Sequence, residues 1–579
     1  MQSIPKFLPV CMQDVKELGW DELDVILISG DAYIDHAAFG VALLGRYLVH
    51  KGFRVGIIAQ PQTDNDYLAL GRPLLFFGIS SGNVDSMVNH YTAQKKIRSE
   101  DDFSPNNKAG LRPDRAVLAY TQKVKQLFKG VITVIGGVEA SLRRIPHYDF
   151  WSDKIKNSLL VDSKASILVY GNAERQILEI AERLKQSRDV EMRPATSTCL
   201  CEARTNPDRT QIEGINGTCI YTKEKPENAI ELVNYPDVDT ADGFYQMTKT
   251  FYNSFPNKIL YYKYLDRYLV HFPPAEALNT NEIDEIYSLP FVREPHPMYK
   301  GKIIKAFEQI KCSILSHRGC YGGCSFCAIG IHQGKKIQFR SKESILKEIE
   351  KLSKKSYFKG TITDIGGASA NMYGTGCKVD SSCSRLSCLC PDICKNLAVD
   401  DKAYLSVLKA TKRNSRVDNI FISSGIRFDL ALLQPEFTKS LCFYHTSGLL
   451  KLAPEHVSQK VLKMMNKPGI DKYLQFADIF IENSKKIDKK QYIIPYLIVG
   501  FPGCTTEDAL ELAKFLKKHN LKVEQIQEFT PTPMTIATMM YYTGIDFYSG
   551  EKIYVPKRSE VRKQKEMAQW FRGEARKSV

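Results

Sequence analysis

Short apolar runs of strand length alternate with amphipathic stretches along most of the chain. In the first half the runs are DVILIS, RVGIIA, RPLLFFGI, GVITVIGG and ASILVYG, and the stretch AERQILEIAERL after the last one has helical spacing. Continuous apolar runs are typical of strands buried on both faces, and strands that alternate with helices favour a parallel sheet. The first half therefore predicts an α/β fold built on a doubly wound parallel sheet.

The same alternation returns from Lys302 onward with six candidate strands. These are QIKCSIL, TITDIG, NIFISS, GLLKLA, IIPYLIV and VEQIQEF, and helical patterns such as SKESILKEIEKLSKK separate most of them. Six units of strand and helix predict a partial (β/α)6 barrel. In such barrels, as in open parallel sheets, functional loops lie at the carboxyl ends of the strands.

The length of 579 residues, with 43% hydrophobic and 25% charged residues, predicts more than one globular domain. We expect a Rossmann-like α/β domain at 1–185, a partly α+β connecting region at 186–295, the barrel at 296–545 and a basic extension at 546–579. No apolar run reaches the length of a membrane helix, and acidic residues stand where a signal peptide would have its apolar core. These features predict a cytoplasmic protein with no membrane partner.

The formal charge of +15 favours polyanionic partners, because Lys and Arg release counterions from phosphates. Nucleic acid is therefore an open partner class. The basic end, KRSEVRKQKEMAQWFRGEARKSV, is typical of a solvated helix, with an RNA-binding tail as the alternative. Fifteen cysteines gather mainly between Cys312 and Cys394, which indicates metal binding in a reducing compartment more than a disulfide framework.

Three cysteines follow the first strand of the predicted barrel, in the run CYGGCSFC: Cys320, Cys324 and Cys327. Three thiolates on one loop can bind three corners of a [4Fe-4S] cubane, while the neighbouring glycines let the backbone wrap closely. The fourth iron is then left without a protein ligand and is open to a small molecule. A zinc site is the alternative, although zinc sites prefer two CxxC pairs or His partners at set spacing.

A second group of cysteines follows the second barrel strand. Its members lie within eighteen residues and are Cys377, Cys383, Cys388, Cys390 and Cys394. Such density indicates a metal site, because four thiolates suffice for an auxiliary iron-sulfur cluster or for a zinc ion. The sequence leaves the choice between these two metals open.

The triple-cysteine loop after a strand, with Phe326 directly before its last cysteine, resembles the motif of the radical S-adenosylmethionine (SAM) superfamily. The resemblance covers about 300–545 and implies a cluster that cleaves SAM reductively to a 5'-deoxyadenosyl radical. This radical would act on an unknown substrate, and an electron donor such as flavodoxin or ferredoxin would supply the electron. Two alternatives are a basic RNA-associated protein with structural zinc sites, and a cobalamin-dependent radical SAM methyltransferase.

The superfamily resemblance also implies which residues contact the cofactor, beside Phe326. In DIGGASANMYG the backbone of Gly366 and Gly367 would receive the methionine amino group, although Ala368 stands where Glu is usual. After the third strand, the ribose hydroxyls and the methionine carboxylate would be held by Ser423, Ser424 and Arg427. After the fifth strand, Gly500 would let the backbone approach adenine.

From end to end the sequence resembles the YgiQ family of radical SAM proteins. The resemblance rests on FLPVCMQDVKELGWDELDVILISGDAYIDHAAFG, GGVEASLRRIPHYDFWSD, HRGCYGGCSFCAI and LKLAPEH. It implies two parts, of which the N-terminal sheet is similar to cobalamin-binding domains. The Asp-x-His-x-x-Gly motif for a lower cobalt ligand is absent, since Asp35 and His36 are adjacent. We expect His36 to be satisfied by local hydrogen bonds at a helix start.

Overall fold

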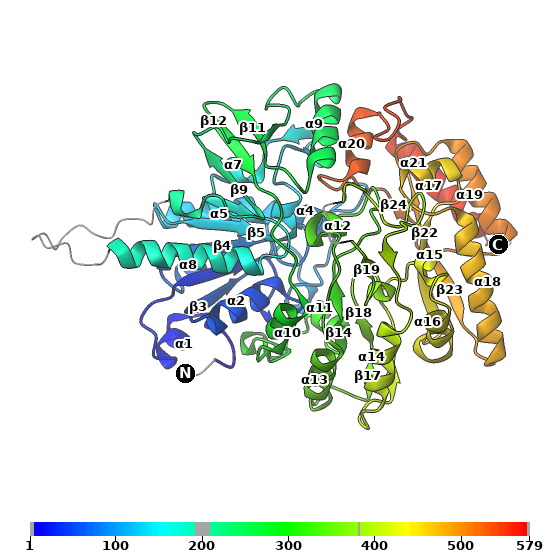
Figure 1. Cartoon of the computed structure of the whole chain (residues 1–579), viewed down its shortest axis with the longest axis horizontal. Helices are drawn as coiled ribbons and strands as arrows, with labels where there is room; N and C mark the ends of the chain where they lie inside the picture. Colours follow the sequence, from blue (N-terminus) through cyan, green and yellow to red (C-terminus); the bar gives the residue numbers. More distant parts are fainter. Residues whose placement is uncertain (1–4, 192–208, 380–382, 576–579) are drawn as a thin grey trace, which may run out of the picture. The chain divides into compact units, whose positions relative to one another are not determined.

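A computed structural model describes residues 5–191, 209–379 and 383–575 (Figure 1). The chain folds into two compact units. The first unit comprises Met1–Asp239, Thr250–Glu276 and Ser288–Lys311. The second unit comprises Thr240–Lys249, Ala277–Tyr287 and Cys312–Val579. Part of the predicted connecting region, 192–208, lies outside the described residues.

The first unit is built on a nine-stranded sheet. Its five parallel strands, in spatial order, are β3 (Val55–Ala59), β1 (Val25–Ser29), β4 (Phe76–Ser80), β5 (Thr133–Gly136) and β8 (Ile167–Val169). Each of the five apolar runs of the first half of the sequence thus supplies one strand. The order of the strands along the chain reverses direction beside β1, as a doubly wound sheet requires. The predicted parallel sheet is confirmed.

Helices cover both faces of this sheet. On one face, α2 (Gly40–His50) and α8 (Glu174–Glu191) share an apolar core with Phe76. On the other face, the ring of Phe77 lies 5.0 Å from that of Phe128, the residue directly after α5 (Ala116–Leu127). Successive residues of a strand point to opposite faces, so these two adjacent phenylalanines serve two different cores.

The sheet continues into the region that the sequence predicted only as a partly α+β connection. The added strands are β9 (Thr218–Thr222), β12 (Arg267–His271), β11 (Leu260–Tyr264) and β10 (Ile230–Glu231). The pairs β8 with β9, β9 with β12 and β12 with β11 are antiparallel. These strands mix aromatic, charged and β-branched residues, so they lack the continuous apolar runs of the parallel strands.

The second unit contains the predicted partial barrel. Its strands are β14 (Ser313–Leu315), β17 (Thr361–Ile362), β18 (Asp364–Gly366), β21 (Asn419–Ile420), β22 (Leu449–Glu455), β23 (Tyr492–Val499) and β24 (Gln527–Glu528). Parallel pairing joins β14 to β18, β17 to β21, and β22 through β23 to β24. A parallel bridge between Ile426 and Leu452 joins the segment just after the third run to the fourth run. All six predicted runs form strands, and TITDIG is divided at Thr363 between two neighbours.

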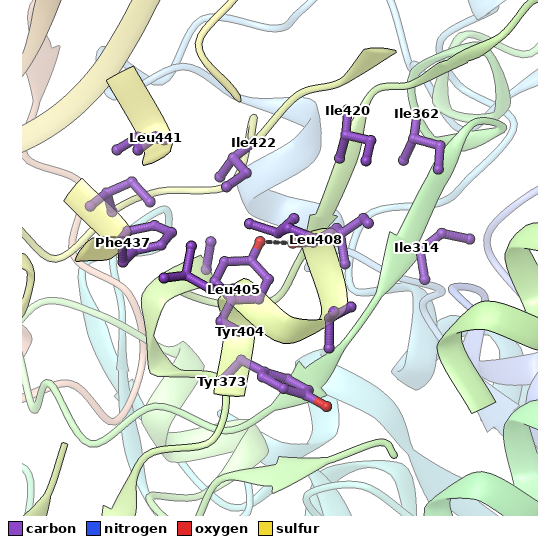
Figure 2. Close-up of a cluster of buried hydrophobic side chains, with 14 of the residues drawn as sticks. Ile314, Ile362, Tyr373, Tyr404, Leu405, Leu408, Ile420, Ile422, Phe437 and Leu441 are labelled. Carbon is purple, nitrogen blue, oxygen red and sulfur yellow. Dashed lines mark hydrogen bonds between the residues drawn. The ribbon is translucent and has the colours of Figure 1, made fainter. Parts of the chain in front are cut away.

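The core of the second unit packs helices against these short strands (Figure 2). Tyr404, at the start of α14 (Ala403–Lys412), donates its hydroxyl to the carbonyl of Ile365 in β18. Helix α13 (Lys342–Ser353) buries Ile345, Ile349 and Leu352 on one face, as its spacing predicts. Within the described ranges, no helix combines the length and apolarity that membrane crossing requires.

Candidate metal centre

The loop that carries Cys320, Cys324 and Cys327 follows β15 (His317–Arg318) and is closely packed against the chain around it. Gly319 has φ +93°, and a Cβ there would lie 2.3 Å from the carbonyl oxygen of Lys336. Gly323 has φ +63°, and its Cβ would lie 2.2 Å from the carbonyl oxygen of Leu386. Only glycine fits both the left-handed backbone and these contacts.

Neighbouring segments hold the loop in place through hydrogen bonds. The amide of Ser325 donates to the carbonyl of Met465 at 3.0 Å, and its hydroxyl donates to the carbonyl of Met464 at 2.8 Å. The side-chain amide of Asn466 donates to the carbonyl of Gly323 at 2.7 Å. The loop is therefore fixed from the segment that follows β22, which is the fourth run of the barrel.

Two hydrogen-bond donors point at the thiols of the loop. The amide of Gly322 donates to Sγ of Cys320 at 3.4 Å, and Nη1 of Arg427 donates to Sγ of Cys324 at 3.3 Å. Burial raises the pKa of the Cys327 thiol to about 12, with the thiol of Cys324 adding to the shift. A bound metal requires thiolates, so these sulfurs fit a multiply charged iron group that compensates the buried negative charge.

Buried ion pairs surround the loop. Arg427 binds Asp429 through two hydrogen bonds, of 2.9 and 2.6 Å. Lys467 lies 3.5 Å from the carboxylate of Glu455, which neighbours Cys327. Burial raises the pKa of Glu455, although Lys467 acts in the opposite direction. Burial also acts to raise the pKa of Asp429, but Arg427 outweighs it and holds that pKa below its usual range.

Arg427 is the predicted ligand of the methionine carboxylate. The structure places its guanidinium in a buried pair with Asp429, with Nη1 turned to Cys324. Two of the three guanidinium nitrogens are thus engaged by an internal carboxylate, and the third faces the cluster loop. The role of Arg427 toward the cofactor carboxylate stays a prediction, while its contact with the cysteine loop is a feature that the sequence did not indicate.

The predicted ribose-binding serines share one half-buried carboxylate as hydrogen-bond acceptor. Both amides, of Ser423 and Ser424, donate to Oδ1 of Asp364, at 2.9 and 3.1 Å. The hydroxyl of Ser424 donates to Oδ2 of the same side chain, and that of Ser423 donates to the carbonyl of Thr363 at 2.7 Å. Burial raises the pKa of Asp364. The ends of the second and third strand runs are joined by this carboxylate.

Gly366 and Gly367 lie at the end of β18, where the chain is too crowded for a side chain. A Cβ at Gly366 would lie 2.1 Å from Oγ of Ser424, and one at Gly367 would lie 2.6 Å from the carbonyl oxygen of His317. These contacts bring the ends of three neighbouring runs close together. They account for glycine at both positions, and the predicted backbone contact with the methionine amino group stays a prediction.

The last two predicted cofactor residues lie on different segments. The ring of Phe326 packs edge-on against that of Phe501, with centroids 6.3 Å apart, so the cysteine loop meets the loop after β23. Gly500 has φ +73°, and a Cβ there would lie 2.6 Å from the side chain of Val561 in α21 (Arg558–Ala568). Helix packing thus explains this glycine, and its approach to adenine stays a prediction.

The predicted basic extension is part of the second unit. Helix α21 packs against α19 (Thr506–Lys518) and buries Gln564 and Ala568. Gln564 accepts a hydrogen bond from the amide of Gly500 at 2.8 Å. The solvated-helix interpretation thus holds for one face of α21 only, because its other face closes the apolar cluster around β23.

The residues of the second cysteine group differ in exposure. Cys377 and Cys383 are exposed, Cys388 and Cys394 are half-buried, and Cys390 is buried. Across the described ranges, no three Cys, His, Asp or Glu side chains converge closely enough to hold one metal ion. Two thiolates on one zinc ion lie only about 3.8 Å apart, as the Zn–S distance implies. A cubane is larger and holds its thiolates farther apart.

Four charged residues of the candidate site were not predicted from the sequence. They are Asp364, Asp429, Glu455 and Lys467. Asp429 stands two residues after Arg427, and Glu455 lies in the segment LKLAPEH, yet the sequence assigned a role to neither. Their roles depend on burial and contacts in the folded chain, which a single sequence does not show for isolated charges in mixed segments.

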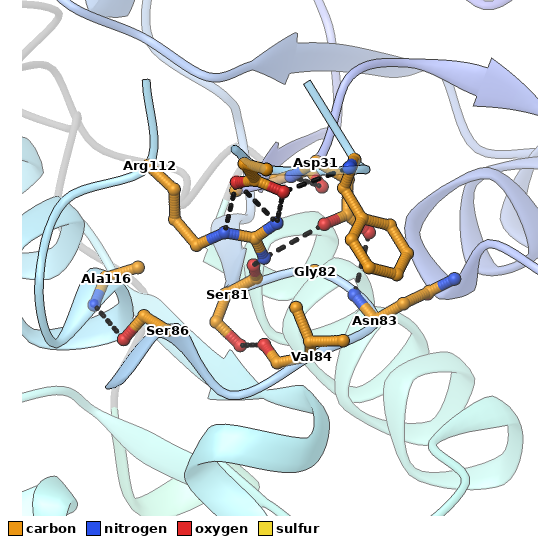
Figure 3. A network of polar contacts seen from close by, with 12 residues as sticks. Asp31, Ser81, Gly82, Asn83, Val84, Ser86, Arg112 and Ala116 are labelled. Atoms are coloured by element: carbon orange, nitrogen blue, oxygen red, sulfur yellow. Dashed lines mark hydrogen bonds and ion pairs between the residues drawn. The ribbon is translucent and has the colours of Figure 1, made fainter. Parts of the chain in front are cut away.

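In the first unit, the loops after the parallel strands contain ion pairs of the protein itself (Figure 3). Arg112 lies 3.0 Å from Asp31 and 3.3 Å from Asp101, and the amide of Asn83 donates to Asp31 at 2.7 Å. Nδ1 of His36 accepts from the amide of Ala38 at 3.0 Å, as expected. Its Nε2 has no hydrogen-bond partner within the described residues.

Comparison with known families decides the classification. The family described as Radical SAM N-terminal matches residues 7–313, and the Radical SAM superfamily matches residues 314–516. The chain belongs to the radical SAM superfamily. It is an enzyme of that superfamily. The match supports a [4Fe-4S] cluster and SAM as its cofactors.

Curated relatives give the family within the superfamily. A UPF0313 protein of Geobacter sulfurreducens is 44% identical, covering 99% of this chain and 94% of its own length. One from Thermotoga neapolitana is 45% identical, covering 96% of this chain and 97% of its own. This radical SAM protein is thus a member of the UPF0313 family, the YgiQ family of the sequence resemblance.

Two solved structures are similar at low identity. The radical SAM methyltransferase TsrM from Kitasatospora setae, with cobalamin and a [4Fe-4S] cluster bound, has a TM-score of 0.47 at 14% identity, covering 88% of this chain and 77% of its own. The cobalamin-dependent SAM radical enzyme OxsB, with aqua-cobalamin bound, has a TM-score of 0.46 at 11% identity, covering 91% and 56%.

Proposed function

We propose that this radical SAM protein binds a [4Fe-4S] cluster through Cys320, Cys324 and Cys327 and uses it to cleave SAM on behalf of an unknown substrate. When bound, such a cluster supplies one electron to SAM and releases methionine and a 5'-deoxyadenosyl radical. A small electron carrier such as flavodoxin or ferredoxin would deliver the electron. The observation that carries the proposal is the position of three half-buried cysteines on one glycine-bent loop that follows β14 and β15.

The residues around the loop would stabilise the thiolate form of the three cysteines and exclude water. Arg427 and the amide of Gly322 donate to two of the three sulfurs, so they favour thiolate over thiol. Asp429 fixes the guanidinium of Arg427 and thereby fixes the direction of its Nη1 donor. Lys467 adds a second buried cation close to the loop. These groups would hold the negative charge of the sulfurs in a site with little water.

The cofactor would lie against the ends of the second and third strand runs. Ser423 and Ser424 would accept hydrogen bonds from ribose hydroxyls, because their own protons already go to Thr363 and Asp364. The backbone of Gly366 and Gly367 would face the methionine end. Phe326 and Gly500 would border the adenine side. These assignments follow the superfamily resemblance and remain part of the proposal.

The test is an anaerobic preparation assayed for iron, sulfide and 5'-deoxyadenosine in the presence of SAM and a strong reductant. We expect the wild type to contain cubane iron and to form 5'-deoxyadenosine. Cys324→Ala should form none, because the cluster loses one of three protein ligands. Cys442→Ala, which removes a thiol buried in the apolar core, is the matched control and should retain formation. Equal 5'-deoxyadenosine formation in the Cys324→Ala variant would defeat the proposal.

A basic RNA-associated protein with structural zinc sites is the second candidate, since the formal charge is +15. The same preparation distinguishes it. Zinc without acid-labile sulfide in the wild type would favour this candidate and remove the radical proposal. Iron with sulfide, together with a lower content of both in a variant lacking the first three cysteines, would support the radical proposal.

Cobalamin is not part of the proposal. Asp35, which precedes His36, is engaged in a buried ion pair with Arg46 at 2.6 Å. Nδ1 of His36 accepts from the amide of Ala38, which leaves only the buried Nε2 for any metal. Mixing the purified protein with hydroxocobalamin and removing free corrinoid by gel filtration tests this choice. Retained corrinoid at one equivalent would return the cobalamin-dependent methyltransferase to the leading position.

A further inference from the structure

The second cysteine group is a hairpin whose two sides bring distant cysteines together. Cys377 lies in β19 (Gly376–Cys377), which pairs in antiparallel fashion with β20 (Leu397–Ala398). Cys377 stands opposite Leu397, and the amide of Leu397 donates to the carbonyl of Cys394 at 2.9 Å. The first and last cysteines of the group, Cys377 and Cys394, therefore lie close together.

A second contact brings the middle of the group to its end. The amide of Cys394 donates to the carbonyl of Cys388 at 2.8 Å, so these two half-buried cysteines are neighbours. The hairpin thus brings Cys377, Cys388 and Cys394 together at its base. Cys383 is the exposed cysteine that lies between Cys377 and Cys388 in the chain.

Cys390 is set apart from the other four. It is buried in an apolar cluster with Tyr321 and Leu430. Its amide donates to Oγ of Ser387 at 3.0 Å, and that hydroxyl donates to the carbonyl of Gly322 at 2.7 Å. Cys390 thus packs beside Tyr321 and Gly322 of the first cysteine loop.

We propose that Cys377, Cys383, Cys388 and Cys394 hold a second iron-sulfur cluster and that Cys390 is not one of its ligands. Within the described residues, no three of their side chains converge as closely as one zinc ion requires. A cubane holds its thiolates farther apart than a single ion does. This proposal goes beyond SAM cleavage and does not depend on it.

The ligand set distinguishes this cluster from the first one. Four thiolates occupy all four corners, so no iron is open for SAM or substrate. The ammonium of Lys335 donates to the carbonyl of Arg385, which lies between Cys383 and Cys388 in the chain, at 2.5 Å. A lysine in this position would offset part of the negative charge of a four-thiolate cluster.

The test begins with the triple variant Cys320→Ala/Cys324→Ala/Cys327→Ala, which removes the first site. After anaerobic reconstitution with iron and sulfide, we expect it to retain about four iron and about four sulfide per chain. The wild type should contain about twice these amounts. Complete loss of iron from the triple variant, or zinc in place of iron in protein isolated without reconstitution, would overturn the proposal.

The ligand set is tested by single substitutions in the same triple background. Cys383→Ala should lose nearly all of the remaining iron, and because Cys383 is exposed its replacement removes little packing. Cys390→Ala should keep the iron content of the background. Equal iron loss in both variants would refute the ligand assignment. Circular dichroism of each variant shows whether the fold is retained, and Mössbauer spectra of the iron-57 wild type count the clusters without any substitution.

The two proposals fail in different ways. If the wild type holds two clusters but makes no 5'-deoxyadenosine, the SAM proposal fails and the second cluster stands. If the wild type makes 5'-deoxyadenosine while the triple variant contains no iron, the second cluster fails and the SAM proposal stands.

Discussion

Arg427 donates a hydrogen bond from Nη1 to Sγ of Cys324 at 3.3 Å while its other two nitrogens bind Asp429. One buried guanidinium thereby connects a carboxylate to the candidate cluster ligand. Its charge is matched on one side by Asp429 and would be matched on the other by a thiolate. Loss of this arginine should affect both the stability of the fold and the retention of iron.

Arg427→Gln should lower the free energy of unfolding by about 3–5 kcal/mol, because it leaves the buried carboxylate of Asp429 without its partner. The double variant Arg427→Gln/Asp429→Asn should recover most of this loss, since no unpaired charge remains. Urea unfolding of the iron-free proteins measures both. Iron analysis after reconstitution should show reduced iron in both variants, because neither has the donor to Cys324. A double variant as unstable as the single one would contradict the paired-charge argument.

Gly323→Ala should destabilise the second unit and reduce iron retention, because its new Cβ would lie 2.2 Å from a backbone carbonyl oxygen. Gly544→Ala is the matched control. Gly544 has a similar φ of +65°, and its Cβ would meet nothing closer than 3.7 Å. The control should therefore show only the strain of a left-handed residue, about 1–2 kcal/mol. Equal losses of stability in urea unfolding would mean that the crowding at Gly323 is unimportant.

Ser424→Ala should weaken SAM binding by about tenfold, because it removes one hydroxyl from the proposed ribose site and one donor to Asp364. Isothermal titration of SAM into the anaerobic protein measures the dissociation constant. Ser406→Ala, at an exposed position of α14, is the control and should leave SAM affinity unchanged. Unchanged affinity in Ser424→Ala would remove this serine from the cofactor site.

Stability should fall with rising pH through the titration of Asp31 in the first unit. Burial raises the pKa of Asp31 from 3.8 to about 6, against the opposing charge of Arg112. The pKa of Asp31 is higher in the folded protein than in the unfolded chain, so protonation of this carboxyl favours the fold at pH values below 3.8. This stabilisation is lost as the pH rises through about 6. The loss amounts to about 3 kcal/mol. Asp31→Asn should show a smaller decline in unfolding free energy between pH 4 and 7, and an identical decline would refute the assignment.

The sequence predicted the parallel strands well because burial on both faces restricts such strands to few residue types. DVILIS has a continuous apolar run that is buried throughout, and TITDIG places its two isoleucines at buried positions. The antiparallel strands β9, β11 and β12 were missed because strands such as LYYKY mix aromatic with charged residues. Periodicity also gave no sign that TITDIG divides at Thr363, since that break depends on pairing with two different neighbours.

The candidate site was predicted in part, by residues whose spacing alone carries information. The three cysteines of CYGGCSFC and the crowded glycines of DIGG are of this kind. Asp364 and Lys467 were not predicted, because a single charge in a mixed segment looks the same whether it is exposed or buried. The separation of Cys390 from its four neighbours likewise depends on the direction of each side chain, which spacing does not determine.

The carbonyls of Tyr321 and Gly322 accept hydrogen bonds from Cys388 and Ser387, at 3.0 and 2.7 Å. The cysteine-rich hairpin therefore packs against the first cysteine loop and is not a removable insertion. Excision of the hairpin would uncover two peptide oxygens beside an oxygen-sensitive centre and admit solvent to it. A relative with a shorter hairpin would need another element to cap these two carbonyls.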